Sequence, residues 1–519
     1  MRTALILTAS ALTLAAQGLD PTALLKPPTD AWPTYNGDYS GRRYSTLDQI
    51  NKDNVHSLSL AWSFQTHSQP LKTTPLEVGG VLYFTVPDQV WAIDARSGRQ
   101  IWHFQRPSQG NHIGNRGVAM YKDRLYLGTP DAHIISLSAR DGKQLWDVEI
   151  ADSHFGYYIS VAPLAVKDEI VIGTSGDQAD VAHSVIALDA DSGKEKWRFH
   201  TLPEAGSAAA KTWPNQQALA HGGAAAWVTA TYDPSLNLIF VGTGNPHPVL
   251  AGVARPGANL YTCSILALNA DTGKLVWYYQ PSPHDTHDWD AVETPVIFDA
   301  EFNGATTKLL AQASRNGYFF LLDRTTGEHL LTTPFVPVNW AKGLDAQGQP
   351  ISNPATEPQP DGALINSFEE GGTNWNAPSF DPQTGLFYVN AQTGYSLYYL
   401  ALTKNGNAEG HQGGNAVDLW SQGRLIAIDY KTGKPRWIRE EEEAVSFPGI
   451  LTTAGHLLFT ADVTGNILAL DAETGGTLWH SYGGGMMNSS PMTYQIDGRQ
   501  YVLTAVDSVL YAWALPRAE

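Results

Sequence analysis

The chain has 519 residues, with 33 basic and 51 acidic side chains and a formal net charge of −18 at pH 7. A surface of this sign repels phosphate groups, so the charge argues against a nucleic acid or an anionic membrane as a partner. Cys263 is the sole cysteine in the sequence, which excludes intrachain disulfide bonds and a covalent haem motif.

Residues 1–18 are typical of a secretory signal. Arg2 precedes an apolar stretch from Ala4 to Ala16, and small residues follow near a plausible cleavage point. The stretch is too short to cross a bilayer core of about 30 Å with any margin. We therefore expect export to the periplasm, no stable membrane insertion, and a single mature domain made of residues 19–519.

A ten-residue pattern recurs seven times along the chain. Each copy has an apolar strand end, a polar turn with glycine, and a second strand whose first large residue is usually Trp. The shortest steps between turn glycines, 98 to 142, 142 to 193 and 433 to 475, match the length of a four-stranded propeller blade. The longer steps indicate insertions, which we place at 336–370 and 395–422. The copies begin at Ile93, Leu137, Leu188, Leu268, Leu322, Ile428 and Leu470.

The two chain ends predict one more blade. Ser57–Phe64 has the pattern of an outer strand without inner strands before it, and Gln500–Leu515 has that of inner strands without an outer one. Pairing them would close an all-β, eight-bladed β-propeller and remove its exposed sheet edges. We interpret the repeated tryptophans as structural wedges between blades. They are Trp62, Trp102, Trp146, Trp197, Trp277, Trp437 and Trp479.

Residues 282–295 interrupt the repeat with a dense acidic segment. Within it stand His284, Asp285, His287, Asp288 and Asp290. If part of the segment is extended, Asp288 and Asp290 point the same way, which suits a hard cation with one carboxylate free to act as a base. Two other interpretations stay open: an acidic loop that only caps turns, and a zinc site formed by the two histidines.

Three further interruptions follow apolar strands or small residues. Asn245 ends one strand and could ligate a cation through its amide oxygen. Trp227 follows a run of small residues that would leave space over its indole for a flat ligand. The segment 172–181 presents Ser175, Gly176, Asp177 and Gln178.

Taken in chain order, longer segments resemble the pyrroloquinoline quinone (PQQ) dependent dehydrogenases, the eight-bladed quinoprotein alcohol and sugar dehydrogenases. The resemblance covers nearly the whole mature chain. The segments that carry it are 32–62, 115–121, 211–215, 313–327, 372–389 and 489–502.

The resemblance implies a role for each matching residue. Asp288 would be the base that takes the alcohol proton while hydride passes to the quinone. Arg315 would hydrogen-bond the quinone oxygens, and Trp227 would stack beneath the ring. A cation, Ca²⁺ or a lanthanide, would be held by Asn245, Asp288 and Gln178, with Asp290 and Asp177 as further carboxylates. The ring and its carboxylates would contact Arg116, Ser160, Ser175, Gly176, Asn374 and Trp375.

The sequence also departs from the pattern of this family. The pair of adjacent cysteines that covers the PQQ face in many members is absent, and His112 stands where sugar-oxidising members tend to have histidine. Gln178 replaces a metal-binding Glu, and Lys72 stands where the family often has a Glu that contacts the cofactor. The missing cysteine pair and His112 favour sugar or polyol substrates. Gln178 removes one ligand charge and predicts weaker cation binding unless Asp177 or Asp290 compensates.

Two functions follow from these patterns. The first is a periplasmic PQQ dehydrogenase that oxidises an alcohol, polyol or sugar and passes electrons to a separate carrier, a cytochrome or a quinone. The second is a cofactor-free propeller that acts as a binding or assembly scaffold.

Overall fold

The computed structural model describes residues 18–107, 114–176, 181–442 and 448–517. Within them, eight sheets of four or five strands form the body of the molecule, each built mainly from consecutive antiparallel strands. The all-β, eight-bladed propeller predicted from the repeat is therefore confirmed.

The first four blades each contain four consecutive strands. They comprise β3 (Leu76–Val78), β4 (Val81–Val86), β5 (Gln89–Asp94) and β6 (Gln100–Gln105); β7 (Ala119–Tyr121), β8 (Arg124–Gly128), β9 (His133–Ser138) and β10 (Gln144–Glu149); β11 (Leu164–Val166), β12 (Glu169–Gly173), β13 (Ser184–Asp189) and β14 (Glu195–His200); and β15 (Thr231–Asp233), β16 (Leu238–Gly242), β17 (Ile265–Asn269) and β18 (Leu275–Tyr279).

The fifth and sixth blades are also built from consecutive strands, and the seventh and eighth each add one strand from the N-terminal part of the chain. They comprise β19 (Val296–Phe302), β20 (Ala305–Ala313), β21 (Tyr318–Asp323) and β22 (His329–Pro334); β25 (Ala363–Ile365), β26 (Ser379–Asp381), β27 (Leu386–Leu400), β28 (Gly414–Asp429) and β29 (Pro435–Glu440); β1 (Tyr44–Ser45), β30 (Leu451–Thr453), β31 (Leu457–Ala461), β32 (Asn466–Asp471) and β33 (Thr477–Tyr482); and β34 (Met492–Ile496), β35 (Arg499–Val506), β36 (Val509–Ala514) and β2 (Ser59–Gln65).

Few elements lie outside the blades. A small hairpin pairs β23 (Ala341–Leu344) with β24 (Pro350–Ser352), and one short α-helix is α1 (Gln216–Ala220). The 3₁₀ turns are η1 (Pro21–Leu25), η2 (Val55–Ser57), η3 (Ser153–Phe155), η4 (Ala209–Thr212), η5 (Gly252–Ala254) and η6 (Pro354–Thr356). Across the described part of the chain, no helix has the length and apolar character needed to cross a membrane.

Both chain ends build the eighth blade, as the strand patterns predict. β2 pairs antiparallel with β36, and Trp62 faces Ala512 in the register. The ring is closed by hydrogen bonds between residues that are more than 440 positions apart.

The blade tryptophans join each blade to the next one. The indole Nε1 of Trp62 donates to the carbonyl of Ala95 at 3.2 Å, and that of Trp197 donates to the carbonyl of Ala270 at 3.0 Å. The turn glycine of the neighbouring blade lies against the same indole: a Cβ built on Gly273 would stand 2.4 Å from the Trp197 ring. Gly273 has a φ of +66°, which favours glycine for a second reason.

The strand order brings two sets of loops to one face of the ring. Because the strands are antiparallel, the loop before the first strand of a blade and the loop after its second strand lie at the same end of the sheet. The first strands of neighbouring blades contact each other, as β7 does with β11 and β15 with β19, so they surround the centre. Loops of both sets therefore converge near the axis, where propellers commonly bind ligands.

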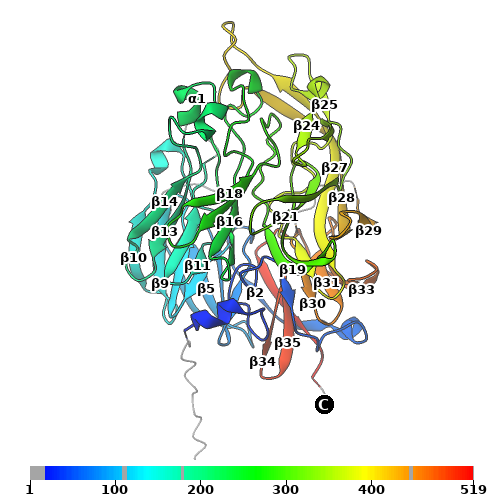
Figure 1. Cartoon of the computed structure of the whole chain (residues 1–519). Coiled ribbons are helices and arrows are strands. Elements are labelled where there is room, and N and C mark those ends of the chain that lie inside the picture. The colour runs from blue at the N-terminus through cyan, green and yellow to red at the C-terminus, as the bar shows by residue number, and fades with distance from the viewer. Residues whose placement is uncertain (1–17, 108–113, 177–180, 443–447, 518–519) are drawn as a thin grey trace, which may run out of the picture.

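The sixth blade extends beyond this face as an arm. β27 and β28 have 15 and 16 residues, and β25 adds to their far end. Figure 1 shows the arm and α1 at the top of the molecule, opposite the C-terminus. The insertion expected at 395–422 is thus largely an extended hairpin.

Candidate functional site

Asp290 is the centre of a buried cluster on the face that carries the arm. Its Oδ2 accepts a hydrogen bond of 2.5 Å from the indole Nε1 of Trp227, and its Oδ1 accepts one of 2.7 Å from the backbone N–H of Asn245. Arg315 Nη1 lies 3.9 Å from Asp290 Oδ2. Asp290 is only 3% exposed. The loops before β15 and β19 and those after β16 and β20 therefore meet at one carboxylate.

Asp288 reaches the same guanidinium by a different backbone path from the expected one. Its Oδ2 lies 3.6 Å from Arg315 Nη2, but its φ is +68°, so the segment is not extended here. The carboxylate of Asp285 accepts hydrogen bonds from the backbone N–H groups of His287, Asp288 and Trp289. These three bonds hold a tight turn, which is why both acidic side chains face Arg315 without strand alternation.

Burial and ion pairing set the charges of the cluster. Burial raises the pKa of Asp288 well above its usual value, and the charge of Arg315 opposes that rise. Burial likewise raises the pKa of Asp290, with Arg315 again opposing. Burial by itself would lower the pKa of Arg315, but the two aspartates raise it, so the guanidinium stays charged. The cluster therefore holds one fixed cation between two carboxyl groups.

Cationic side chains cover the aromatic wall of the site. The guanidinium of Arg116 lies 4.8 Å from the ring centroid of Trp227 and 5.0 Å from that of Trp375. The Nζ of Lys72 lies 5.7 Å from the Trp375 centroid. The space expected over the Trp227 indole thus contains the Arg116 side chain. Arg116 Nη1 donates to Ser160 Oγ at 2.8 Å, which fixes its position.

The other residues predicted to contact the cofactor lie in loops beside this cluster. Asn374 Nδ2 donates to Glu370 Oε2 at 3.0 Å, and Asn374 Oδ1 accepts from the backbone N–H of Trp375. Ser175 is buried after β12, and Gly176 packs so closely that a Cβ there would stand 3.1 Å from the carbonyl of Gly156.

Several sequence-based predictions fall outside these contacts. His112, Asp177 and Gln178 lie outside the described residues. The rings of His284 and His287 hydrogen-bond to the backbone carbonyls of Gly257 and Thr356, respectively. Over the ranges that the structure describes, no group of three or more His, Cys, Asp or Glu side chains could hold a metal ion by itself.

The buried polar atoms of the site fit a flat anionic cofactor. Arg315 Nε and Ser175 Oγ are buried and have no hydrogen-bond partner within the described residues. Burial and the neighbouring charge of Arg116 lower the pKa of Lys72, so an anion between these two cations would be favoured. Aromatic faces, convergent cations and unused donors together suit a planar ring that carries oxygens and carboxylates.

Two residues of the site were not singled out from the sequence. In the sequence, Asp285 stands out only as part of the acidic segment, although Asp commonly hydrogen-bonds to backbone N–H groups a few residues on and so marks turns. Arg315 Nη2 donates to the backbone carbonyl of Glu369 at 2.9 Å. Burial raises the pKa of Glu369, and the charge of Arg315 opposes that rise. Glu369 belongs to the insertion before β26, where no repeat or periodicity marks it.

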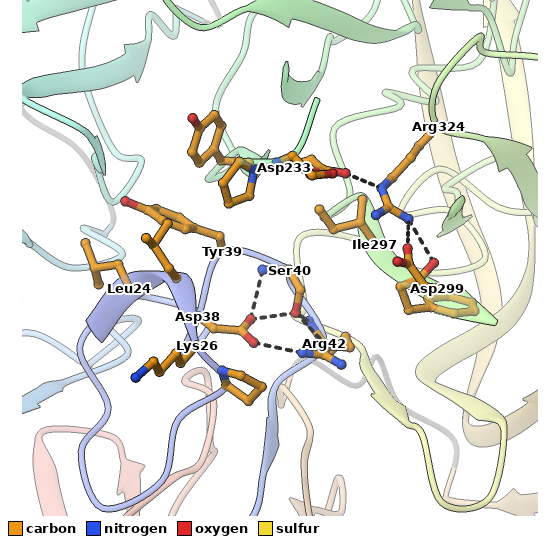
Figure 2. Close-up of a pocket in the computed structure, with 16 residues that line it drawn as sticks. Leu24, Lys26, Asp38, Tyr39, Ser40, Arg42, Asp233, Ile297, Asp299 and Arg324 are labelled. Carbon is orange, nitrogen blue, oxygen red and sulfur yellow. Dashed lines mark hydrogen bonds and ion pairs between the residues drawn. The ribbon is translucent and has the colours of Figure 1, made fainter. Parts of the chain in front are cut away.

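A separate cavity of about 580 Å³ lies at the other face, between the N-terminal segment, β15 and β19 (Figure 2). Its charged groups neutralise each other: Arg42 pairs with Asp38 at 3.1 Å, and Arg324 pairs with Asp233 and Asp299, both at 2.7 Å. None of the predicted site residues lines this cavity.

The fold and this cluster define an eight-bladed propeller with an acid–arginine–indole site at one end of its axis. The family model described as "PQQ: Glucose/ethanol/alcohol dehydrogenase, beta-propeller domain" matches residues 32–361 and 423–502. The chain therefore belongs to the family of PQQ-dependent dehydrogenases.

Individual relatives agree with this membership. A quinohemoprotein alcohol dehydrogenase of Comamonas testosteroni is 36% identical over 518 residues, which cover 92% of this chain and 73% of the relative. The crystal structure of a quinohemoprotein alcohol dehydrogenase from Comamonas testosteroni superposes with a TM-score of 0.91 at 32% identity, over 97% of this chain and 84% of that one. A europium-containing methanol dehydrogenase superposes with a TM-score of 0.85 at 29% identity, over 95% and 99% of the two chains.

Proposed function

We propose that this protein is a PQQ-dependent dehydrogenase that oxidises an alcohol, with polyols and sugars as further candidates. The observation that carries the proposal is the placement of Arg315 between Asp288 and Asp290, with the indole of Trp227 bonded to the same cluster. The names of the similar dehydrogenases favour alcohols, and the missing cysteine pair and His112 are the reason to include sugars.

Different residues of the site would bind the PQQ cofactor and accept the proton of the alcohol. Bound PQQ supplies a two-electron acceptor. We propose that its ring contacts Trp227 and Trp375 once the Arg116 guanidinium, which lies over both indoles, turns toward its carboxylates. Further contacts to its rim and carboxylates are proposed for Lys72, Ser160, Ser175, Gly176 and Asn374. Arg315 presents its buried Nε to an oxygen and stabilises negative charge there. Asp288 accepts the proton of the alcohol hydroxyl at a carboxylate oxygen.

We also assign the cation to this cluster. Asn245, Asp288 and Asp290 offer oxygen ligands, the kind that Ca²⁺ and lanthanides prefer, and Asp177 and Gln178 would complete the set from the segment beside Gly176. Asp290 already accepts two hydrogen bonds, so it serves first to position Trp227 and the Asn245 loop. The europium named for one structural neighbour is the reason to test lanthanides.

The cellular setting follows from the sequence. We propose that residues 1–18 direct export to the periplasm and that residues 19–519 act as one domain. We propose that electrons pass to a separate cytochrome or quinone, in line with the cytochrome c named for a similar 1-butanol dehydrogenase.

A PQQ-binding experiment distinguishes the enzyme from the scaffold alternative. A scaffold has no need for a buried arginine held between the acids Asp288 and Asp290 beside two indoles, because burying charged groups is costly. Purified protein mixed with PQQ and Ca²⁺ or La³⁺ is expected to bind PQQ and to reduce a dye with a panel of alcohols and sugars. A protein that binds no PQQ under any of these conditions would support the scaffold.

The Asp288→Asn variant tests the proposed base. It is expected to lose turnover and to keep the unfolding temperature of the parent, because the amide preserves the shape of the side chain but cannot take a proton. The exposed Asp361→Asn variant is the matched control. Equal rates in the parent and in Asp288→Asn would remove Asp288 from the mechanism.

A further inference from the structure

The arm has one apolar face that is exposed to solvent. In the strand register, Leu364 pairs with Leu397, Leu397 pairs with Val417, and Tyr395 pairs with Trp420. Directly paired residues point to the same side of a sheet, and every second residue of a strand does so too, so these five side chains share a face. They are all at least partly exposed, as is the bulged residue next to Trp420. We call this set the arm patch: Leu364, Tyr395, Leu397, Val417, Leu419 and Trp420.

The opposite face of the arm packs on the loop that carries the proposed base. Tyr398 on this face is buried, and its hydroxyl donates to the carbonyl of His287 at 3.0 Å. The ring centroids of Tyr398 and His287 lie 5.3 Å apart, and the His287 ring stacks on Trp289 at 4.3 Å. Trp289 stands between Asp288 and Asp290 in the chain. The arm patch is therefore one sheet away from the site loop, and layers packed on a sheet are about 10 Å apart.

The size of the arm patch limits what can cover it. Six partly exposed side chains offer on the order of a few hundred Å² of apolar surface, the range in which exposed patches mark interaction sites. A stable protein dimer buries about 800 Å² or more on each partner, whereas transient electron-transfer encounters bury less. The patch therefore fits a partner that binds briefly and leaves.

The charge around the arm patch indicates the sign of that partner. The patch has no charged side chain, but the two insertions that contain it, 336–370 and 395–422, carry seven acidic and two basic residues. A second copy of a chain with a net charge of −18 is repelled from this surface, and a basic protein is attracted to it.

We propose that the arm patch is the docking surface of a small basic electron-carrier protein that has an apolar patch of its own. This inference rests on the proposed function, because it names the partner that would take the electrons. Each alcohol oxidised to its carbonyl product yields two electrons and two protons. Two oxidised one-electron carriers would dock in turn and take one electron each, and the protons would pass to water. The acidic insertions steer the carrier to this face, and burial of the patch holds it there.

The kinetic test uses mitochondrial cytochrome c, a small basic haem protein, and its succinylated form, in which lysines have become acidic. The parent with PQQ, Ca²⁺ and an alcohol that supports dye reduction is expected to reduce cytochrome c, and to reduce the succinylated form about tenfold or more slowly. Equal rates with the two forms would overturn the proposal of a basic partner.

Val417→Lys tests the surface itself. A lysine in the patch would be buried without a partner and would face a basic protein, so cytochrome c reduction is expected to fall about tenfold or more while dye reduction stays unchanged. Val276→Lys on β18 is the matched control, because Val276 is likewise an exposed strand valine, at 54% against 43%, and the added charge is the same. It is expected to keep the parent rate.

A binding test separates this inference from the proposed function. Calorimetric titration of oxidised cytochrome c into the protein without PQQ is expected to show binding that Val417→Lys weakens and Val276→Lys leaves unchanged. This pattern without oxidation of any alcohol would overturn only the proposed function. Dye-linked oxidation with equal binding and reduction of cytochrome c by the parent and Val417→Lys would overturn only the docking surface. A dimer of the parent in sedimentation that Val417→Lys dissociates would assign the patch to a second copy and so also overturn it.

Discussion

The contact between a turn glycine and the indole of the preceding blade can be tested with one methyl group. In Gly273→Ala the added Cβ would lie 2.4 Å from Cε3 and 2.7 Å from Cδ2 of Trp197, far inside van der Waals contact. A φ of +66° costs a residue with a Cβ about 1–2 kcal/mol, and overpacking in a tight core costs about 1–3 kcal/mol more. We therefore expect the free energy of unfolding to fall by about 2–5 kcal/mol.

Gly304→Ala is the matched control for this variant. Gly304 has a φ of +83°, but nothing lies within 4 Å of a Cβ built there, so the substitution carries the backbone cost alone. Urea unfolding followed by circular dichroism gives both losses, and their difference is the energy of the indole contact. Equal destabilisation of the two variants would refute the view that the glycine repeat exists to receive the indole.

Three other perturbations probe the site and its electrostatics. Trp227→Ala is expected to weaken PQQ binding about three- to tenfold in a fluorescence titration, since aromatic stacking is worth about 0.5–1.5 kcal/mol, while the exposed Trp420→Ala keeps the parent affinity. Asp285→Ala removes the acceptor of three backbone N–H groups, so it is expected to lower turnover through the displaced Asp288 and to reduce stability by about 1–3 kcal/mol; unchanged turnover would contradict that positioning role. Burial raises the pKa of Glu77 to about 8 in the folded chain, above its usual 4.5, so the folded state holds its proton more tightly and the stability of the parent declines as the pH rises from about 4.5 through 8. Glu77→Gln is expected to remove this part of the decline, up to about 1.4 kcal/mol per pH unit, and identical pH profiles in urea unfolding would show that the carboxyl is not buried as described.

The architecture was predictable because its signals are local. A pattern of about ten consecutive residues predicts each blade hairpin. A Trp at the end of that pattern can only be buried by a neighbouring blade. The same argument predicted the pairing of β2 with β36, because unpaired strand edges at both chain ends are unfavourable. The arm is different: its position in the chain was predictable, but no short pattern indicates that Leu386–Leu400 and Gly414–Asp429 continue as one long hairpin.

The candidate site was predictable only in part. Residue types and their places between strands predicted which loops meet, and Trp227, Asn245, Asp290 and Arg315 do lie together. Strand alternation did not predict the conformation around Asp288. Three backbone N–H groups donate to the carboxylate of Asp285 and hold this segment in a turn instead of a strand.

The sequence by itself determined the number of blades, because each blade carries the same short local pattern. It also determined the way the ring closes, because the two chain ends carry complementary strand patterns, and the family, because the matching segments are read directly from the residues. Only the tertiary structure decided that Arg116 lies over the Trp227 indole and that Arg315 donates to the backbone carbonyl of Glu369. Those contacts join loops from different blades, and their geometry depends on how eight sheets pack around one axis rather than on any local stretch of chain.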